Sequence, residues 1–278
     1  MTSSERPPSK ISVDDRIPEA GTWARLRTFT PARIGLARAG VSIAAGPLLD
    51  FRAAHAAARD AVMAPLNVRA LVSQLASLRS SVMTAVSCAG DRREYLMRPD
   101  LGRELSPGSA QTLAANKGEY DLSIVAADGL SSIAVQRHVT PLLERLLPAL
   151  SETWRVAPIV IAELARVGLG DAICSALGAA SVLVLIGERP GLSATDSLSA
   201  YVTWASQRGV TDADRNCVSN IRPEGVAYDE AARQVAYLLN AARAGGYSGV
   251  ALKNRADEVL LAQARAVDHP SAQFPVRF

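Results

Sequence analysis

A glutamate and an arginine stand together directly after a run of apolar residues. Val182–Ile186 is followed by Gly187–Ser193, GERPGLS, in which Glu188 and Arg189 precede a proline and a glycine. One interpretation is a tight turn with a surface ion pair, which contributes little to stability. The other is a rigid turn that directs the Glu188 carboxylate at a polar ligand, because a restricted backbone needs little ordering on binding. The residues alone favour both interpretations equally.

Three further segments hold polar residues that suit ligand binding: Ala127–Ser132, Ala165–Asp171 and Asp212–Gly225. In an open α/β sheet, ligands bind outside the carboxyl ends of the strands, and the first two segments, like GERPGLS, follow predicted strands. Cys217 in the third segment is a small buried hydrophobe in the simplest interpretation. In the alternative interpretation, the main chain of Cys217 contacts a ligand. No neighbouring group lowers the pKa of its thiol, so a nucleophile is not expected.

The common nucleotide and hydrolase motifs are missing. Gly168 and Gly170 begin a G-x-G pattern, but Ile173 stands where the dinucleotide fingerprint needs a third glycine. Neither the phosphate-binding G-x-x-x-x-G-K-[ST] nor the G-x-S-x-G nucleophile motif occurs. These absences disfavour a nucleotide-dependent oxidoreductase and a serine hydrolase.

The histidines do not indicate a catalytic or metal site. Asp128, Ser131 and His138 fall on one loop and its following helix, which argues against a triad. His55 lies in an apolar stripe with helical spacing, so a core histidine is favoured over a ligand. No Cys/His spacing suits zinc.

Composition narrows the class of protein. The 278 residues, 49% of them hydrophobic, suffice for one large domain or two smaller ones. The 30 basic and 27 acidic residues nearly balance, which gives no reason to expect nucleic acid as a partner. Three cysteines favour a reducing compartment. No apolar run approaches the roughly 18 residues of a membrane span, so a cytosolic protein is expected.

Alternating apolar patterns predict a mostly parallel sheet flanked by helices, a Rossmann-like α/β fold, with an N-terminal helical region. The predicted strands are 121–129, the start of 157–170, 181–187 and 248–253; the predicted helices are 47–62, 66–90, 130–150, 171–179, 228–246 and the polar stretch after Gly191.

Five motifs in one order resemble the small (light) subunit of ethanolamine ammonia-lyase. They are Thr30–Gly40, Glu94–Leu105, Val125–His138, Leu185–Tyr201 and Asp214–Gly225. The resemblance covers residues 22–253, and five ordered motifs make it highly specific. It implies an adenosylcobalamin-dependent lyase that converts ethanolamine to acetaldehyde and ammonia by a radical mechanism. It also implies a large-subunit partner, a TIM barrel that holds the substrate, in a hetero-oligomer of large–small pairs.

The resemblance also implies roles for individual residues. The family's cobalamin contacts map onto Val167, Glu188 and Cys217, without a catalytic residue or a metal ligand in this chain. Glu188 would accept an amide N–H of a corrin side chain, Val167 would offer an apolar contact, and Cys217 would contribute its main chain or packing. Ala165 replaces a glycine that is frequent in the family, which bears on the Val167 contact. No histidine stands in the D-x-H-x-x-G motif, in keeping with a family that retains the cofactor's own axial base.

The expected organisation has four parts: a disordered leader 1–20, a mainly helical region 21–115 that docks the large subunit, a cobalamin-contacting α/β domain 116–255 and a tail 256–278. Trp23–Gly40 carries four arginines and no acid, typical of a solvated basic face or of a docking surface for an acidic partner. Some family members enter a bacterial microcompartment through a longer leader, so cytoplasm and microcompartment both stay open. The alternative function is a stand-alone α/β binding or scaffold protein, since a fold alone does not decide function.

Overall fold

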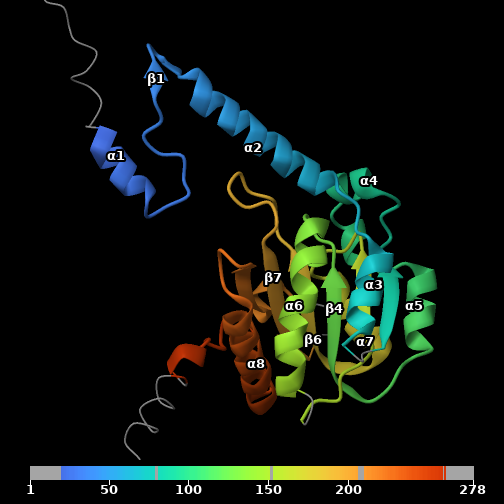
Figure 1. Cartoon of the computed structure of the whole chain (residues 1–278). Helices are drawn as coiled ribbons and strands as arrows, with labels where there is room; N and C mark the ends of the chain where they lie inside the picture. The colour runs from blue at the N-terminus through green and yellow to red at the C-terminus, as the bar shows by residue number, and fades with distance from the viewer. Residues whose placement is uncertain (1–19, 79–80, 151–152, 206–209, 259, 261–278) are drawn as a thin grey trace, which may run out of the picture. The chain divides into compact units, whose positions relative to one another are not determined.

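Apolar runs in the sequence form the central strands of a six-stranded sheet (Figure 1). The computed structural model describes residues 20–78, 81–150, 153–205, 210–258 and 260. The chain divides into two units, Met1–Ala56 and Ala57–Phe278. The predicted leader, apart from Ala20, and the predicted tail beyond residue 260 lie outside the described residues.

The sheet of the larger unit has the order β3-β5-β4-β6-β7-β8. The first four strands in this order run parallel, whereas β7 and β8 are antiparallel to their neighbours. The α/β prediction with a mostly parallel sheet is confirmed, and the antiparallel edge was not predicted. The strands are β3 (Val82–Val86), β4 (Tyr120–Ala127), β5 (Ile159–Glu163), β6 (Ala179–Gly187), β7 (Leu198–Trp204) and β8 (Asn216–Ile221).

Helices cover both faces of this sheet (Figure 1). One face packs against α3 (Val68–Ala76), α6 (Ser132–Leu150) and α8 (Tyr228–Gly245). The other face packs against α5 (Pro107–Ala114) and α7 (Leu169–Leu177). The short helices α4 (Arg92–Met97), η2 (Leu101–Arg103) and η3 (Asp212–Asp214) lie in connections between these elements.

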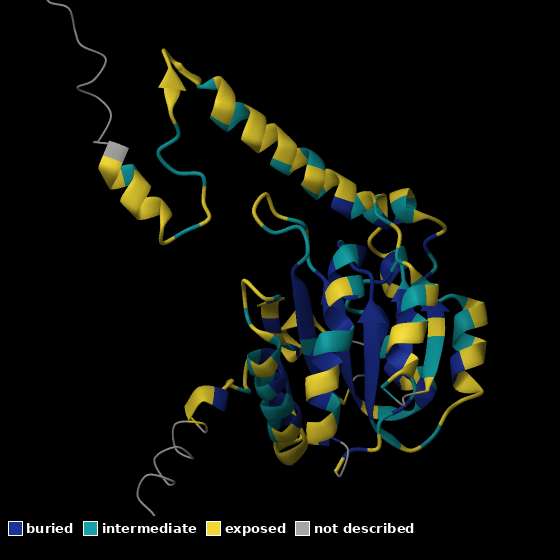
Figure 2. Cartoon of the chain, in the orientation of Figure 1, coloured by how far each residue is buried: buried dark blue, intermediate teal, exposed yellow. Residues whose placement is uncertain are grey.

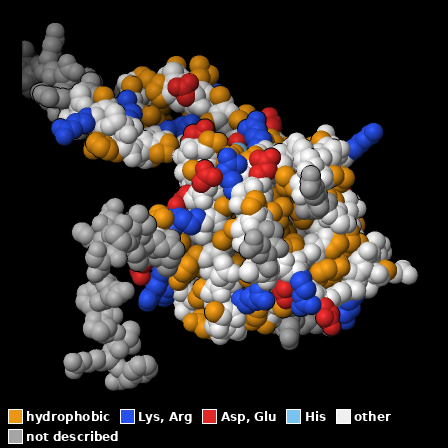
Figure 3. Space-filling model, turned by 60° about the horizontal axis from the view of Figure 1, so that its bottom comes forward, with side chains coloured by type: hydrophobic (Ala, Val, Ile, Leu, Met, Phe, Trp, Pro, Cys, Tyr) orange, Lys and Arg blue, Asp and Glu red, His pale blue; other side chains and the backbone are white. Residues whose placement is uncertain are grey.

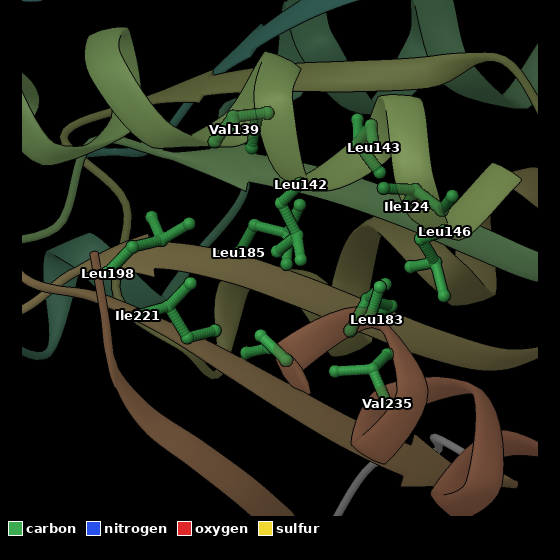
Figure 4. Close-up of a cluster of buried hydrophobic side chains, with 14 of the residues drawn as sticks. Ile124, Val139, Leu142, Leu143, Leu146, Leu183, Leu185, Leu198, Ile221 and Val235 are labelled. Atoms are coloured by element: carbon green, nitrogen blue, oxygen red, sulfur yellow. The ribbon is translucent and has the colours of Figure 1, made fainter. Parts of the chain in front are cut away.

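The strand β6 shows why its sequence is apolar without interruption. Val182 and Val184 join the core under α7, whereas Leu183 and Leu185 join the core under α6 and α8. Successive side chains point to opposite faces of a strand, and both faces are covered here, so all positions from Ser181 to Gly187 are buried. The buried strands stand out in Figure 2, and Figure 4 shows Leu183 and Leu185 directed at the leucines of α6 and at Val235.

The predictions of the two long helices α6 and α8 are confirmed. The buried residues of α6 recur at helical spacing, as in Val135, Val139, Leu142 and Leu146, and the helix continues through Pro141. The predicted helix 228–246 is α8, and Gly246 ends it in the left-handed conformation at φ 72°.

Three local predictions were wrong. The stretch 66–90 contains α3 but also the edge strand β3, whose five residues are too short for periodicity to separate strand from helix. The predicted helix after Gly191 is a loop leading into β7. The polar segment 212–225, for which no strand was predicted, contains β8. Residues 248–253 form a turn instead of a strand; there Ser248 and Gly249 bond to Trp204 and Asn216.

The described part of the smaller unit contains α1 (Ala20–Arg27) and a two-stranded ribbon, β1 (Arg38–Ala39) with β2 (Ser42–Ile43). The Arg27 guanidinium donates to the carbonyl oxygens of Ile34 and Gly35 at 3.1 and 2.7 Å, which fixes the chain between them.

Helix α2 (Ala45–Met63) contains the boundary between the two units. Ala61 is the one buried residue of α2. The prediction of a core histidine was wrong, because His55 is exposed and contacts the Phe51 ring. A helical stripe on the sequence does not say whether an element exists for it to pack against.

No helix among the described residues has the length and apolarity needed to cross a membrane. On the face shown in Figure 3, basic and acidic side chains are interspersed with apolar ones, as the small net charge of +3 suggests.

Candidate ligand-binding face

Three loops meet at the carboxyl edge of the parallel strands, as predicted from the order of the elements. They are Ala127–Ser132 after β4, Ala165–Asp171 after β5 and Gly187–Ser193 after β6. The Leu130 N–H donates to the Gly187 oxygen at 2.9 Å. The Asp128 carboxylate accepts the Ala165 N–H at 2.9 Å. Direct bonds therefore join each loop to its neighbour.

Two glycines allow this close approach. Gly129 has a φ of 56°, a left-handed conformation that glycine adopts without cost. A Cβ atom on Gly187 would lie 2.0 Å from the Ser131 carbonyl oxygen. The segment GERPGLS therefore begins with glycine because the backbone of the Ala127–Ser132 loop occupies the space of a side chain.

Glu188 is held between the two antiparallel strands. Its Oε1 accepts the Ser199 hydroxyl at 2.6 Å and the Asn220 N–H at 2.7 Å. In the part of the chain that the structure describes, the Glu188 carboxylate bonds to Ser199 and Asn220 and forms no ion pair with Arg189, so the interpretation as a surface pair was wrong. Within the described residues the second oxygen, Oε2, has no hydrogen-bond partner. The carboxylate is thus fixed through one oxygen and open at the other.

Cys217 lies opposite Tyr201 in the pairing of β7 with β8. It is exposed, so the prediction of a small buried residue was wrong. Its Sγ lies 3.9 Å from the Ser199 hydroxyl. Although the residue as a whole is exposed, its thiol is partly buried beside Ser199, and this burial raises the thiol pKa. The thiol therefore stays protonated at neutral pH, which agrees with the expectation that it is no nucleophile.

Two cavities open on the face of the sheet that carries α7. The smaller, about 400 Å³, is lined by both Val167 and Glu188. The larger, about 1260 Å³, is lined by Val167 as well. Arg166 and Tyr201 line both cavities, so the two form adjoining parts of one surface. Cys217 lines neither cavity, but its strand partner Tyr201 lies between them.

Sequence reasoning missed the residues that fix the loop carrying Val167. Tyr95, fully buried, donates its hydroxyl to the Ala165 oxygen at 3.1 Å. The Arg166 guanidinium carbon lies 4.2 Å from the Tyr95 ring centre, and that of Arg92 lies 4.8 Å from it. Burial raises the pKa of Tyr95 to about 12, so it stays a neutral donor. The available signal was the motif Glu94–Leu105, which contains Tyr95.

Arg92 and Asp128 also stabilise the loop that carries Val167. Their side chains form a buried ion pair at 3.3 Å, and Arg92 also donates to the Gly129 oxygen at 2.8 Å. Burial is the main cause that raises the pKa of Asp128, while its backbone donors and Arg92 oppose the shift. Asp128 therefore serves to fix the backbone at Ala165, where the preceding Leu164 has an unusual φ of 53°.

The triad that the sequence argued against is not formed. Ser131 donates to the Thr195 oxygen at 2.8 Å. His138 lies in the core with Nδ1 2.8 Å from the Tyr228 hydroxyl and Nε2 3.4 Å from the Asp196 carboxylate. These contacts hold Thr195 and Asp196, which follow the GERPGLS segment, at the start of α6, and they supply no nucleophile–base pair.

This buried histidine predicts a pH effect on stability. Burial lowers the pKa of His138 below its ordinary 6.5, outweighing the attraction of Asp196. The unfolded chain therefore binds a proton more readily, and stability falls as the pH drops through 6.5. We expect His138→Gln to lose less melting temperature between pH 7.5 and 5.5 than the unaltered chain. Equal losses in circular-dichroism melts of the two proteins would contradict this.

The amino-acid sequence of this chain matches a known protein family. The family model described as ethanolamine ammonia-lyase light chain (EutC) matches residues 20–253. The chain belongs to this family. It is 48% identical over 248 residues to the ethanolamine ammonia-lyase small subunit of Ralstonia nicotianae, which covers 87% of this chain and 92% of that protein. It is 47% identical over 272 residues to the small subunit from Pseudomonas fluorescens strain Pf0-1, covering 96% of both.

The family resemblance seen in the motifs is thus confirmed, and the chain is a member of a family of lyase subunits. The match includes all three loops of the carboxyl edge and both antiparallel strands. The residues that line the two cavities therefore all lie within the range that matches the family.

Proposed function

We propose that this chain, as the small subunit of ethanolamine ammonia-lyase, covers one side of adenosylcobalamin with the face that carries α7. The observation that supports this best is the meeting of Val167 and Glu188 in one cavity. The two residues are 21 positions apart in the sequence, and the family resemblance implies that both contact cobalamin.

The residues on this face fit a large ligand that is rich in amides. The larger cavity, about 1260 Å³, exceeds the range of about 300–1,000 Å³ that is usual for drug-sized ligands. Its charged lining balances, with three basic residues and three acidic ones: Arg103, Arg166, Arg215, Glu104, Asp171 and Asp212. Such a neutral lining suits the amide donors and acceptors of corrin side chains better than it suits an anion.

The chain's own residues would bind and orient. Glu188 would accept an amide N–H on Oε2, while its bonds to Ser199 and Asn220 keep the carboxylate in place. Val167 would offer an apolar contact. Cys217 would contribute through packing or its main chain. Adenosylcobalamin supplies the radical chemistry that converts ethanolamine to acetaldehyde and ammonia.

The same proposal includes a large-subunit partner with a TIM barrel, in a hetero-oligomer of large–small pairs. Region 21–115 would dock it, because large apolar side chains exposed together mark interaction surfaces. Phe29 is 79% exposed and Val41 is 96% exposed, and four further apolar side chains of the smaller unit are exposed: Leu26, Ile43, Leu49 and Phe51. For the location we propose the cytoplasm, with a microcompartment as the alternative that fractionation would reveal.

Copurification with the large subunit tests this function. We expect ammonia release from ethanolamine only when both chains and adenosylcobalamin are present, because in this proposal the chain contributes binding contacts and the large subunit holds the substrate. Each chain alone, and the complex without cofactor, are the controls. Failure to form a complex, together with no activity, would instead support the alternative of a stand-alone binding or scaffold protein.

A further inference from the structure

Arg215 makes an unusual set of contacts at the start of β8. Its side chain is only 3% exposed. Both terminal nitrogens donate to the Asp171 carboxylate, Nη1 to Oδ1 at 2.8 Å and Nη2 to Oδ2 at 2.5 Å. Nη1 also donates to the Thr203 hydroxyl at 3.0 Å. One guanidinium therefore binds two other elements at once.

These contacts join parts of the chain that the sheet keeps apart. Asp171 lies in the first turn of α7, which follows β5, whereas Arg215 lies just before β8. Three strands, β4, β6 and β7, separate β5 from β8 in the sheet. Main-chain hydrogen bonds connect the Val167 loop to β8 only through these three strands, whereas the Arg215–Asp171 pair joins the start of α7 to the start of β8 directly.

The bond to Thr203 places this pair within the candidate site. Ser199, Tyr201 and Thr203 are two residues apart on β7, so they share the face that carries α7. Glu188 accepts a hydrogen bond from Ser199, and Arg215 donates one to Thr203. Tyr201, which lines both cavities, lies between these two attachments.

Energetics argue that this pair serves more than stability. Removing two charges from water costs free energy, and apolar residues of similar volume often stabilise a protein as well. The planar fork of arginine, however, sets both distance and orientation when it binds a carboxylate through two nitrogens. Lysine offers one ammonium group and cannot reproduce that geometry.

We propose that Arg215 is a positioning residue for the cofactor. It holds the Val167 loop against β7 and β8 at the spacing at which Val167 and Tyr201 contact the same ligand. This inference rests on the proposed function, because it assigns Arg215 a role in binding adenosylcobalamin without contact to the reacting atoms.

The test is Arg215→Lys in the assembled large–small enzyme. We expect adenosylcobalamin, titrated by its visible absorption, to bind about tenfold more weakly, with a smaller change in kcat at saturating cofactor. Val235→Ala is the matched control, since Val235 is buried on α8 in the core of the opposite face. It should lower the melting temperature without weakening cobalamin binding.

Thr203→Val provides a second test that removes one hydrogen bond while the ion pair stays, and it should weaken cobalamin binding less. If Arg215→Lys does not assemble, Thr203→Val alone decides the question. Variants that lose melting temperature but bind cobalamin as tightly as the Val235→Ala control would show a purely structural role and overturn the inference. An unaltered enzyme that binds no cobalamin would instead refute the proposed function itself.

Discussion

Replacing Gly187 by alanine is expected to destabilise the chain by about 3 kcal/mol, the upper range for overpacking. The new Cβ would lie 2.0 Å from the oxygen of Ser131, 2.7 Å from its carbonyl carbon and 2.8 Å from the Asp128 oxygen. All three are backbone atoms, which cannot rotate away as the end of a side chain can. The loops Ala127–Ser132 and Gly187–Ser193 would have to separate.

Gly191 offers a matched control four residues along the same loop. A Cβ there would lie 3.4 Å from the Ala194 oxygen, close to an ordinary contact. We expect Gly191→Ala to change the free energy of unfolding by about 0.5 kcal/mol or less, as for most surface substitutions. Denaturant unfolding of both variants measures the difference. Similar losses in the two would show that loop flexibility, and not the close approach at Gly187, decides stability.

Glu188→Gln is expected to weaken adenosylcobalamin binding by the assembled enzyme about tenfold to a hundredfold, as for the loss of a hydrogen bond to a charged group. Glutamine keeps one oxygen, which can still accept from Ser199 and Asn220, so the local structure should persist. Its amide nitrogen replaces Oε2, however, and turns an acceptor into a donor. The variant therefore isolates the oxygen that faces the ligand.

Two further variants separate binding from folding. Glu188→Ala removes both the internal bonds and the proposed contact, so it should weaken cobalamin binding and also lower the melting temperature. Ser199→Ala removes one internal bond and leaves the carboxylate, so it should cost stability mainly. Unchanged cobalamin affinity in Glu188→Gln, measured by titration of the complex, would refute the assignment of Glu188.

Long, strongly patterned elements could be predicted from the sequence because their local preferences agree with their packing. The apolar run of β6, the helical stripe of α6 and the glycine that ends α8 each indicate one structure. The short strand β3 and the antiparallel pair β7–β8 could not be predicted in this way. Five to seven residues do not distinguish strand from loop or helix until a neighbouring strand pairs with them.

By itself, the sequence determined the α/β class, the family and the loops that follow the parallel strands, including Val167 and Glu188. These follow from local patterns and from motifs of adjacent residues. Tertiary structure alone decided that Glu188 bonds to Asn220 and Arg215 to Asp171, pairs that lie 32 and 44 residues apart. Many such pairings are compatible with one sequence, and only the order and direction of the strands select among them, because they decide which distant side chains share a face.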